Sequence, residues 1–140
     1  MSGAYDRKSV MRVLAHADEA ELAEGLAAAG LATELPELRP TETGLTMVRG
    51  RIGGDGRAFN LGEMTVTRAA VQGPSDITGV ADLKGRCPRR ARLAAVADAY
   101  WQNDATRSSI ETSVLAPIEK RLEAAHRKAA EEAAATKVDF

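Results

Sequence analysis

Residues 42–71 decide the fold of this chain, and they read ETGLTMVRGRIGGDGRAFNLGEMTVTRAAV. Two apolar runs, residues 45–52 and 59–71, lie on either side of the glycine-rich segment 53–56. A glycine-rich stop between two apolar runs is typical of a β-hairpin. Gly62 interrupts the second run and predicts a β-bulge. We therefore expect two antiparallel strands, the second of them bulged.

A third predicted strand follows this hairpin. Residues 73–76 have the composition of a turn, and the apolar run at 77–83 completes a three-stranded antiparallel meander. On the other side of the hairpin, residues 35–40 contain two prolines and are predicted to form an extended connector.

Two helices are predicted before the sheet. Asp18 followed by Glu21 has the form of a capping box that opens the second helix, and Gly30 is suited to end it. The first helix is predicted over residues 6–16, because Val10, Val13 and Leu14 share one helical face with Ala17, the residue directly after it.

Two more helices are predicted after the sheet. Pro88 suits the first turn of a helix that continues to a polar break at residues 103–107. Ser108 and Glu111 then resemble another capping box. Pro117 lies inside the helical pattern that follows, so a kink or two abutting helices are expected there.

This order of elements predicts an α+β fold in one domain, residues 1–140: a small antiparallel three-stranded meander packed with two N-terminal and two C-terminal helices, the last one long. A helix of roughly 30 residues extends about 45 Å, whereas a domain of this size has a radius of gyration of about 14 Å. After Leu122 the last helix offers mainly alanine as apolar surface. We therefore expect residues 117–140 to pack on another chain, with fraying in solution as the alternative.

The composition argues against several classes of protein. A net charge of −1 does not favour a chain whose whole surface binds nucleic acid or an anionic membrane. No uncharged apolar stretch is long enough to span a bilayer, and the first apolar run, residues 10–17, contains Arg12 and His16 and does not resemble a signal peptide. The single cysteine, Cys87, cannot form an internal disulfide, so a cytoplasmic location is predicted.

The sequence lacks the usual catalytic and metal-binding signatures. His16 and His126 lie on separate helical segments without a ligand partner at metal-like spacing, so we interpret both as surface or helix-end residues. Cys87 is interpreted as a small, half-buried residue. The glycines of residues 50–56 lack the Lys-Ser/Thr pair and the helix that a phosphate-binding loop needs. No catalytic residue, metal or cofactor is predicted for this chain.

Arg68 is the first of two charged features that could contact a ligand or a partner. Strand alternation places it on one face with three apolar neighbours, where a guanidinium needs a carboxylate or another anion. One interpretation is an internal ion pair with Glu42 or Glu63, and the other is a carboxylate or phosphate at a subunit boundary. The apolar neighbours are Met64, Val66 and Ala70.

The second feature is a basic cluster at the start of the third predicted helix. Positive charge is unfavourable at a helix N-terminus unless water or an anion surrounds it. The cluster is therefore interpreted either as a solvated face or as a contact for an acidic partner or a triphosphate. Its members are Lys84, Arg86, Arg89, Arg90 and Arg92. Sequence-specific nucleic-acid binding is least favoured, because no aromatic residues are interleaved.

Several segments of the chain resemble the PhnG family of carbon–phosphorus lyase subunits, and together they cover most of it in order. The most specific is GEMTVTRAAV at residues 62–71. The others are RVLAHA at 12–17, ETGL at 42–45, Gly53 and Gly54 with Phe59, AAVADA at 94–99, ET at 111–112, LAP at 115–117 and KVDF at 137–140. After Gly85 and Arg86 the family tends to carry Asp-Lys and then a histidine, whereas this chain has Cys87-Pro88-Arg89-Arg90. A role of that histidine is therefore not carried over.

The resemblance implies a cytoplasmic bacterial subunit that assembles with PhnH, PhnI and PhnJ. It implies that this assembly, with PhnI as its catalytic centre, displaces adenine from ATP by a phosphonate and forms ribose 1-methylphosphonate 5-triphosphate. PhnJ then cleaves the carbon–phosphorus bond by radical chemistry. PhnG itself is implied to be an accessory or scaffold subunit, in agreement with the missing catalytic signatures.

Three hypotheses about function follow. The leading one is an obligate partner subunit that forms a homodimer when alone. The second is a subunit that contributes phosphate-binding arginines, Arg68 or Arg89 with Arg90, to a shared active site. The third is a free-standing module that binds anions or nucleic acid.

Overall fold

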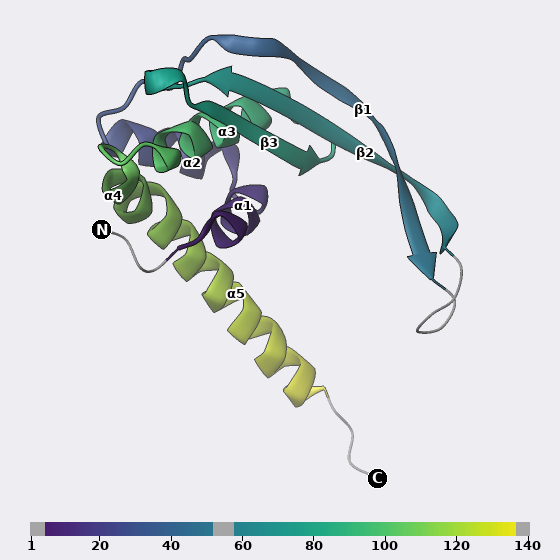
Figure 1. Cartoon of the computed structure of the whole chain (residues 1–140). Coiled ribbons are helices and arrows are strands. Elements are labelled where there is room, and N and C mark those ends of the chain that lie inside the picture. Colours follow the sequence, from purple (N-terminus) through teal and green to yellow (C-terminus); the bar gives the residue numbers. More distant parts are fainter. Residues whose placement is uncertain (1–4, 52–57, 137–140) are drawn as a thin grey trace.

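The computed structural model describes residues 5–51 and 58–136, and it confirms the predicted α+β order (Figure 1). Two helices precede the sheet, and a second set of helices follows it. The elements are α1 (Arg7–Ala15), α2 (Glu19–Ala28), β1 (Glu37–Arg51), β2 (Ala58–Gln72), the 3-10 turn Pro74–Asp76, β3 (Thr78–Lys84), α3 (Pro88–Gln102), α4 (Arg107–Ile110), the π-turn Glu111–Leu115 and α5 (Ala116–Ala135).

The three strands form the predicted antiparallel meander in the order β1-β2-β3. The bulge expected at Gly62 is confirmed, because Val48 pairs with Gly62 while the next residue, Arg49, pairs with Asn60. Gly62 has a φ of 152°, which a glycine adopts without strain. The hairpin is confirmed by the pairing of Arg51 with Ala58, and its predicted turn at residues 53–56 lies outside the described residues.

The start of β1 differs from the sequence-based expectation. Residues 35–40 were predicted to be a connector, but β1 already begins at Glu37, which pairs with Val71 of β2. Pro40 is tolerated in this strand because it lies between Arg39 and Glu42, where the register shifts, and because β1 is an edge strand. A proline removes one ladder donor, and edge strands and bulges are where this loss is accepted.

Helix α3 forms the centre of the core. All the helices lie on one side of the sheet (Figure 1), and α3 contacts β2 and β3 on one side and α1 and α2 on the other. Every residue of α3 from Leu93 to Trp101 is buried. The sheet contributes alternating residues of β2 and β3 to this core: Thr67, Ala69, Val71, Ala81 and Leu83.

Local capping explains both N-terminal helices. The predicted capping box of α2 is confirmed, since the Glu21 carboxylate accepts a hydrogen bond of 2.9 Å from the backbone N–H of Asp18. Gly30 follows α2 with a φ of 71°, as expected of a helix-terminating glycine. Asp6 caps α1 in the same manner with Ser9, a capping box that the sequence interpretation did not identify.

The predicted capping box of Ser108 and Glu111 is wrong. Helix α4 begins at Arg107 with Thr106 as its N-cap, two residues earlier than that box requires. Glu111 is used elsewhere, because its carboxylate accepts a hydrogen bond of 2.9 Å from the Trp101 indole N–H. The hydroxyl of Thr106 donates to the Tyr100 carbonyl at 2.6 Å. Pro88 does lie in the first turn of α3, as predicted.

A π-turn accompanies Pro117. The chain is helical from Arg107 to Ala135, but residues Glu111–Leu115 form a π-helical turn, and Pro117 follows in the first turn of α5. The disturbance expected at Pro117 is thus a wider turn just before it, within one long helix. A π-turn leaves room for a residue that cannot donate a backbone hydrogen bond.

Candidate functional site

Arg68 lies on the open face of the sheet. Its side chain is 63% exposed and forms an ion pair of 3.5 Å with Asp82 of β3. In the backbone register Arg68 is opposite both Glu42 and Asp82. Arg68 therefore does form an ion pair within the chain, as one interpretation predicted, but its partner is Asp82 rather than Glu42 or Glu63. The side chain remains accessible, and a contact with an anion or a partner stays a prediction.

A small hollow adjoins Arg68 on this face. It has a volume of about 90 Å³, and two arginines and one glutamate are among the residues around it. Such a hollow is too small for a nucleotide but can accept one carboxylate or phosphate oxygen group. Its lining residues are Arg39, Pro40, Glu42, Arg68, Ala69 and Ala70.

The basic cluster is largely engaged within the chain. Arg90 donates hydrogen bonds to the carbonyl oxygens of Ala15 at 3.3 Å and Ala17 at 3.1 Å, and to that of Lys84 at 3.3 Å. These are backbone groups at and just after the end of α1 and at the last residue of β3, so Arg90 of α3 joins three segments. Two other members form ion pairs, Arg89 with Glu19 at 3.0 Å and Arg92 with Glu37 at 3.7 Å. Lys84 and Arg86 are exposed.

Arg90→Ala is expected to lower the free energy of unfolding by about 1–2 kcal/mol, because three carbonyl oxygens lose a charged donor. Arg86→Ala, in the same basic cluster but on the loop before α3 and with an exposed side chain, is the matched control and should change it by less than about 0.5 kcal/mol. Urea unfolding of both variants measures the difference. Equal effects of the two substitutions would show that Arg90 does not brace the end of α1.

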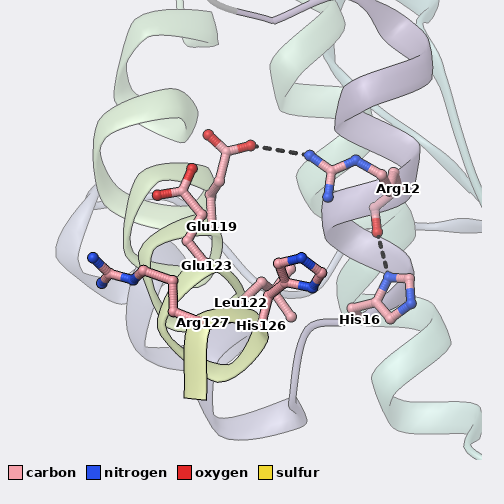
Figure 2. A pocket seen from close by; sticks show the side chains of 7 residues that line it. All are labelled: Arg12, His16, Glu119, Leu122, Glu123, His126 and Arg127. Carbon is pink, nitrogen blue, oxygen red and sulfur yellow. Dashed lines mark hydrogen bonds and ion pairs between the residues drawn. The ribbon is translucent and has the colours of Figure 1, made fainter. Parts of the chain in front are cut away.

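A cleft lies between α1 and α5 (Figure 2). It has a volume of about 500 Å³ and brings together both histidines of the chain, which the sequence had placed on separate helices without suggesting that they meet. The ring of His126 points from α5 toward α1, where His16 stands at the end of the helix. The lining residues are Arg12, His16, Glu119, Leu122, Glu123, His126 and Arg127.

The polar groups of this cleft are only partly paired. Arg12 binds Glu119 across the cleft at 3.1 Å, and His16 donates its Nδ1–H to the Arg12 carbonyl at 2.9 Å. Within the described part of the chain, no group of three metal-ligating side chains is close enough to hold a metal ion. The mixture of both charges with the apolar side chain of Leu122 favours a peptide segment over a metal or a small anion as the occupant.

Sequence reasoning missed this cleft for a physical reason. His16 was correctly interpreted as a helix-end residue, since it is the C-cap of α1. Its approach to His126 depends on how α5 packs against α1, which no local pattern encodes. The spacing of Leu122 and His126, four residues apart, was the one available signal, because it places them on the same face of a helix.

Helix α5 is held firmly only at its beginning. Arg121 binds the Glu21 carboxylate through two hydrogen bonds of 2.7 and 2.9 Å and donates to the His16 carbonyl at 2.8 Å. The hydrogen bonds from Arg121 hold the pKa of Glu21 below its usual value, despite partial burial. From Glu123 to Thr136 every side chain is exposed, so the predicted overhang is confirmed (Figure 1). That another chain covers it stays a prediction.

Outside this cleft, one carboxylate is enclosed in the core. Asp98 of α3 is fully buried, and its Oδ2 accepts hydrogen bonds from Arg7 at 3.0 Å, the Val80 N–H at 2.9 Å and Gln102 at 3.1 Å. Its Oδ1 has no hydrogen-bond partner among the described residues, and burial raises the pKa of Asp98. Because it is closed off from solvent, Asp98 joins α1, β3 and α3 rather than serving a substrate.

No helix within residues 5–51 and 58–136 has both the length and the apolar character required to cross a membrane.

Comparison with known proteins agrees with the resemblance noted in the sequence. The family model described as "Phosphonate metabolism protein PhnG" matches residues 5–140. The chain is also 45% identical, over 139 residues, to "Alpha-D-ribose 1-methylphosphonate 5-triphosphate synthase subunit PhnG" of Rhizobium meliloti (strain 1021), an alignment that covers 99% of this chain and 88% of the relative. The chain therefore belongs to the PhnG family of phosphonate metabolism proteins.

Proposed function

We propose that this chain is an accessory, scaffold subunit of a cytoplasmic α-D-ribose 1-methylphosphonate 5-triphosphate synthase, and that it assembles with PhnI, PhnH and PhnJ. In this proposal the complex joins a phosphonate such as methylphosphonate to the ribose 5-triphosphate part of ATP and releases adenine. PhnI carries the catalytic centre, and this chain binds no cofactor of its own. The name of the relative in Rhizobium meliloti supports the reaction.

The overhanging half of α5 is the observation that carries the scaffold role. Side chains 123–136 are all exposed, and the contacts that anchor the helix to other described residues lie before them, at Ile118, Glu119, Arg121 and Leu122. An isolated helix of this length is marginal in water, so a surface that covers it stabilises both partners. The described residues also hold no cluster that resembles a catalytic centre: the buried carboxylate is enclosed, and the histidines lie in an open cleft.

Co-expression with PhnI is expected to yield a single species that contains both chains on size exclusion at micromolar concentration. The physical reason is that partner subunits bury apolar surface that this chain leaves exposed, including Leu38, Leu45 and Met47 of β1. Separate elution of the two chains at micromolar concentration would contradict the scaffold role.

An alternative role is favoured by the two arginines around the hollow on the open face of the sheet. If Arg68 and Arg39 bind a phosphate or carboxylate in a shared active site, Arg68→Ala lowers turnover of the assembled complex while co-elution with PhnI is unchanged. If turnover and assembly fall together, or neither falls, the alternative fails. Arg89 and Arg90 are less suited to this test. Arg90 donates hydrogen bonds to the backbone at the end of α1, so substituting it would also lower the stability of the fold.

In isolation the chain is proposed to self-associate, since the same exposed surfaces then have no other partner. Homodimer formation does not exclude the assembly with PhnI, provided that the dimer is weak or uses a surface that PhnI leaves free.

A further inference from the structure

The side of α5 that packs on the domain continues beyond it as an alanine face. Ile118 is buried and Leu122 half-buried, and after them Ala125, Ala129 and Ala133 follow at steps of three or four residues. Successive residues of an α-helix are about 100° apart, so these side chains lie along one side of α5. We call Leu122, Ala125, Ala129 and Ala133 the alanine face. It ends at the cleft between α1 and α5, because Leu122 belongs to both.

The charged side chains beside the alanine face can pair with the same side chains of a second copy. Lys128 and Glu132 lie on the same flank of α5, four residues apart, and neither side chain has an ion-pair partner within the described part of the chain. In an antiparallel pair of α5 helices related by a two-fold axis at Ala129, the same flanks of the two copies face each other. Lys128 of each copy then lies two residues, about 3 Å along the helices, from the level of Glu132 of the other, a distance that its long side chain spans. In a parallel pair this flank would instead face the opposite flank of the other copy, and Lys128 would not meet Glu132. Isologous contacts of this kind are the usual basis of homodimers.

The length of the overhang fits the same arrangement. Fourteen steps separate Leu122 from Thr136, about 21 Å of helix at 1.5 Å per residue. With the axis at Ala129, Thr136 of one copy reaches the level of Leu122 of the other, where the cleft opens, and the two domains lie at opposite ends without contact. Small side chains on both surfaces permit the close approach of two helices.

The cleft is suited to the end of a helix. The carbonyl groups of a helix C-terminus carry partial negative charge and attract cations. Helix α5 ends at Ala135. On the side of the cleft toward α1 lie the two imidazoles and Arg12, which is paired with Glu119, whereas Arg127 extends away from α1 (Figure 2). The last turn of α5 from a second copy would thus meet the ring of His126 there, whose N–H can donate to a free carbonyl oxygen.

From these observations we infer that the free chain forms a homodimer through an antiparallel pair of α5 helices, with the C-terminal turn of each α5 in the α1–α5 cleft of the other copy. This inference specifies the surface of the self-association proposed above and rests on it. One helix pair buries less than the roughly 1,600 Å² of a standard interface, so the dimer dissociates in the micromolar range. The overhang then remains available to PhnI.

Charge exchange in trans tests the pairing. Lys128→Glu and Glu132→Lys each place two pairs of like charges across the axis, and each variant alone should dimerise about tenfold more weakly than the parent chain. An equimolar mixture of the two variants restores both opposite-charge contacts, and sedimentation equilibrium should show recovery of the parent affinity as a heterodimer. An effect of either substitution on the helix of its own copy would not be rescued by mixing, and failure of rescue overturns the inference.

Cross-linking tests the orientation and the register. In a Cys87→Ser background, Ala129→Cys should be joined to itself by a short bis-maleimide, because the two positions meet at the axis. Ala125→Cys should not be joined, since antiparallel pairing separates its two copies by eight residues along the helices, about 12 Å. Efficient linkage of Ala125→Cys, or none of Ala129→Cys, contradicts the arrangement.

Co-elution with PhnI, measured on the same variants, separates this inference from the proposed function. If the full chain stays monomeric at high micromolar concentration but still co-elutes with PhnI, the helix pair is wrong and the subunit role stands. If the helix pair forms but PhnI does not co-elute, the subunit role is wrong and the dimer stands.

Discussion

Gly79→Ala is expected to lower the free energy of unfolding by about 3 kcal/mol, because strand β3 and helix α3 approach each other too closely for a methyl group. A Cβ atom at position 79 would collide with the carbonyl oxygen of Ala95 and lie 2.7 Å from the Ala99 Cβ and 2.8 Å from the Ala99 backbone nitrogen. These are mostly backbone atoms of a buried helix and cannot turn aside. Urea unfolding, followed by the fluorescence of Trp101, measures the loss.

Gly44→Ala is the matched control for this substitution. Gly44 also lies in the sheet, in β1, but no atom lies within 4 Å of the Cβ that alanine would add. We expect a change of at most about 0.5 kcal/mol, or a slight gain, because alanine restricts the unfolded chain more than glycine does. A Gly79→Ala variant as stable as Gly44→Ala would show that α3 does not lie against β3 at the distance described.

Asp98→Ala is expected to lower the free energy of unfolding by about 3 kcal/mol at neutral pH. The substitution leaves the guanidinium of Arg7, the Val80 N–H and the Gln102 amide without their shared acceptor in or near the core. Removing one partner from a buried charged pair typically has an effect of this size. Urea unfolding at fixed protein concentration is the measurement, so that self-association does not alter the comparison.

Asp98→Asn is the control that separates charge from shape. It keeps an oxygen acceptor and the volume of the side chain, so its loss should be clearly smaller than that of Asp98→Ala. Burial raises the pKa of Asp98 in the folded chain above the ordinary value of an aspartate side chain, about 3.9. The stabilisation linked to its proton is therefore complete below about pH 4 and is lost as the pH rises through the folded pKa. The stability advantage of the parent chain over Asp98→Asn should accordingly be largest near pH 4 and shrink toward pH 7. An advantage that grows with pH would contradict the raised pKa.

Local patterns predicted most of the fold. The strands followed from the alternation of residues 64–71 and the glycines around them, and the capping box of Asp18 and Glu21 formed as expected. Both depend on neighbours in the chain, so the sequence carries them directly. The N-terminal part of β1 was not predicted, because Pro40 locally disfavours a strand. The strand forms there because Glu37 pairs with Val71 of β2, a contact between distant parts of the sequence.

The candidate sites depended on tertiary contacts and were less predictable. Glu111 was assigned to a cap because no local signal shows that the Trp101 indole N–H needs an acceptor. Arg90 belonged to a basic cluster in the sequence, yet packing places it against the end of α1, where free carbonyl groups accept its hydrogen bonds. For Arg68, alternation gave the correct face, but the neighbour across the sheet, Asp82, comes from a strand whose register was unknown.

The π-turn at Glu111–Leu115 sets the rotational phase of everything after it. Each residue added to or removed from a helix turns the following part by about 100°. A chain with one residue fewer in this turn could continue as a regular α-helix, but Ile118 would rotate out of the core and the small side chains beyond Leu122 would face another direction. The single wide turn thus fixes the rotation of α5 about its own axis. It turns Ile118 toward the core and sets the direction that the small side chains beyond Leu122 face.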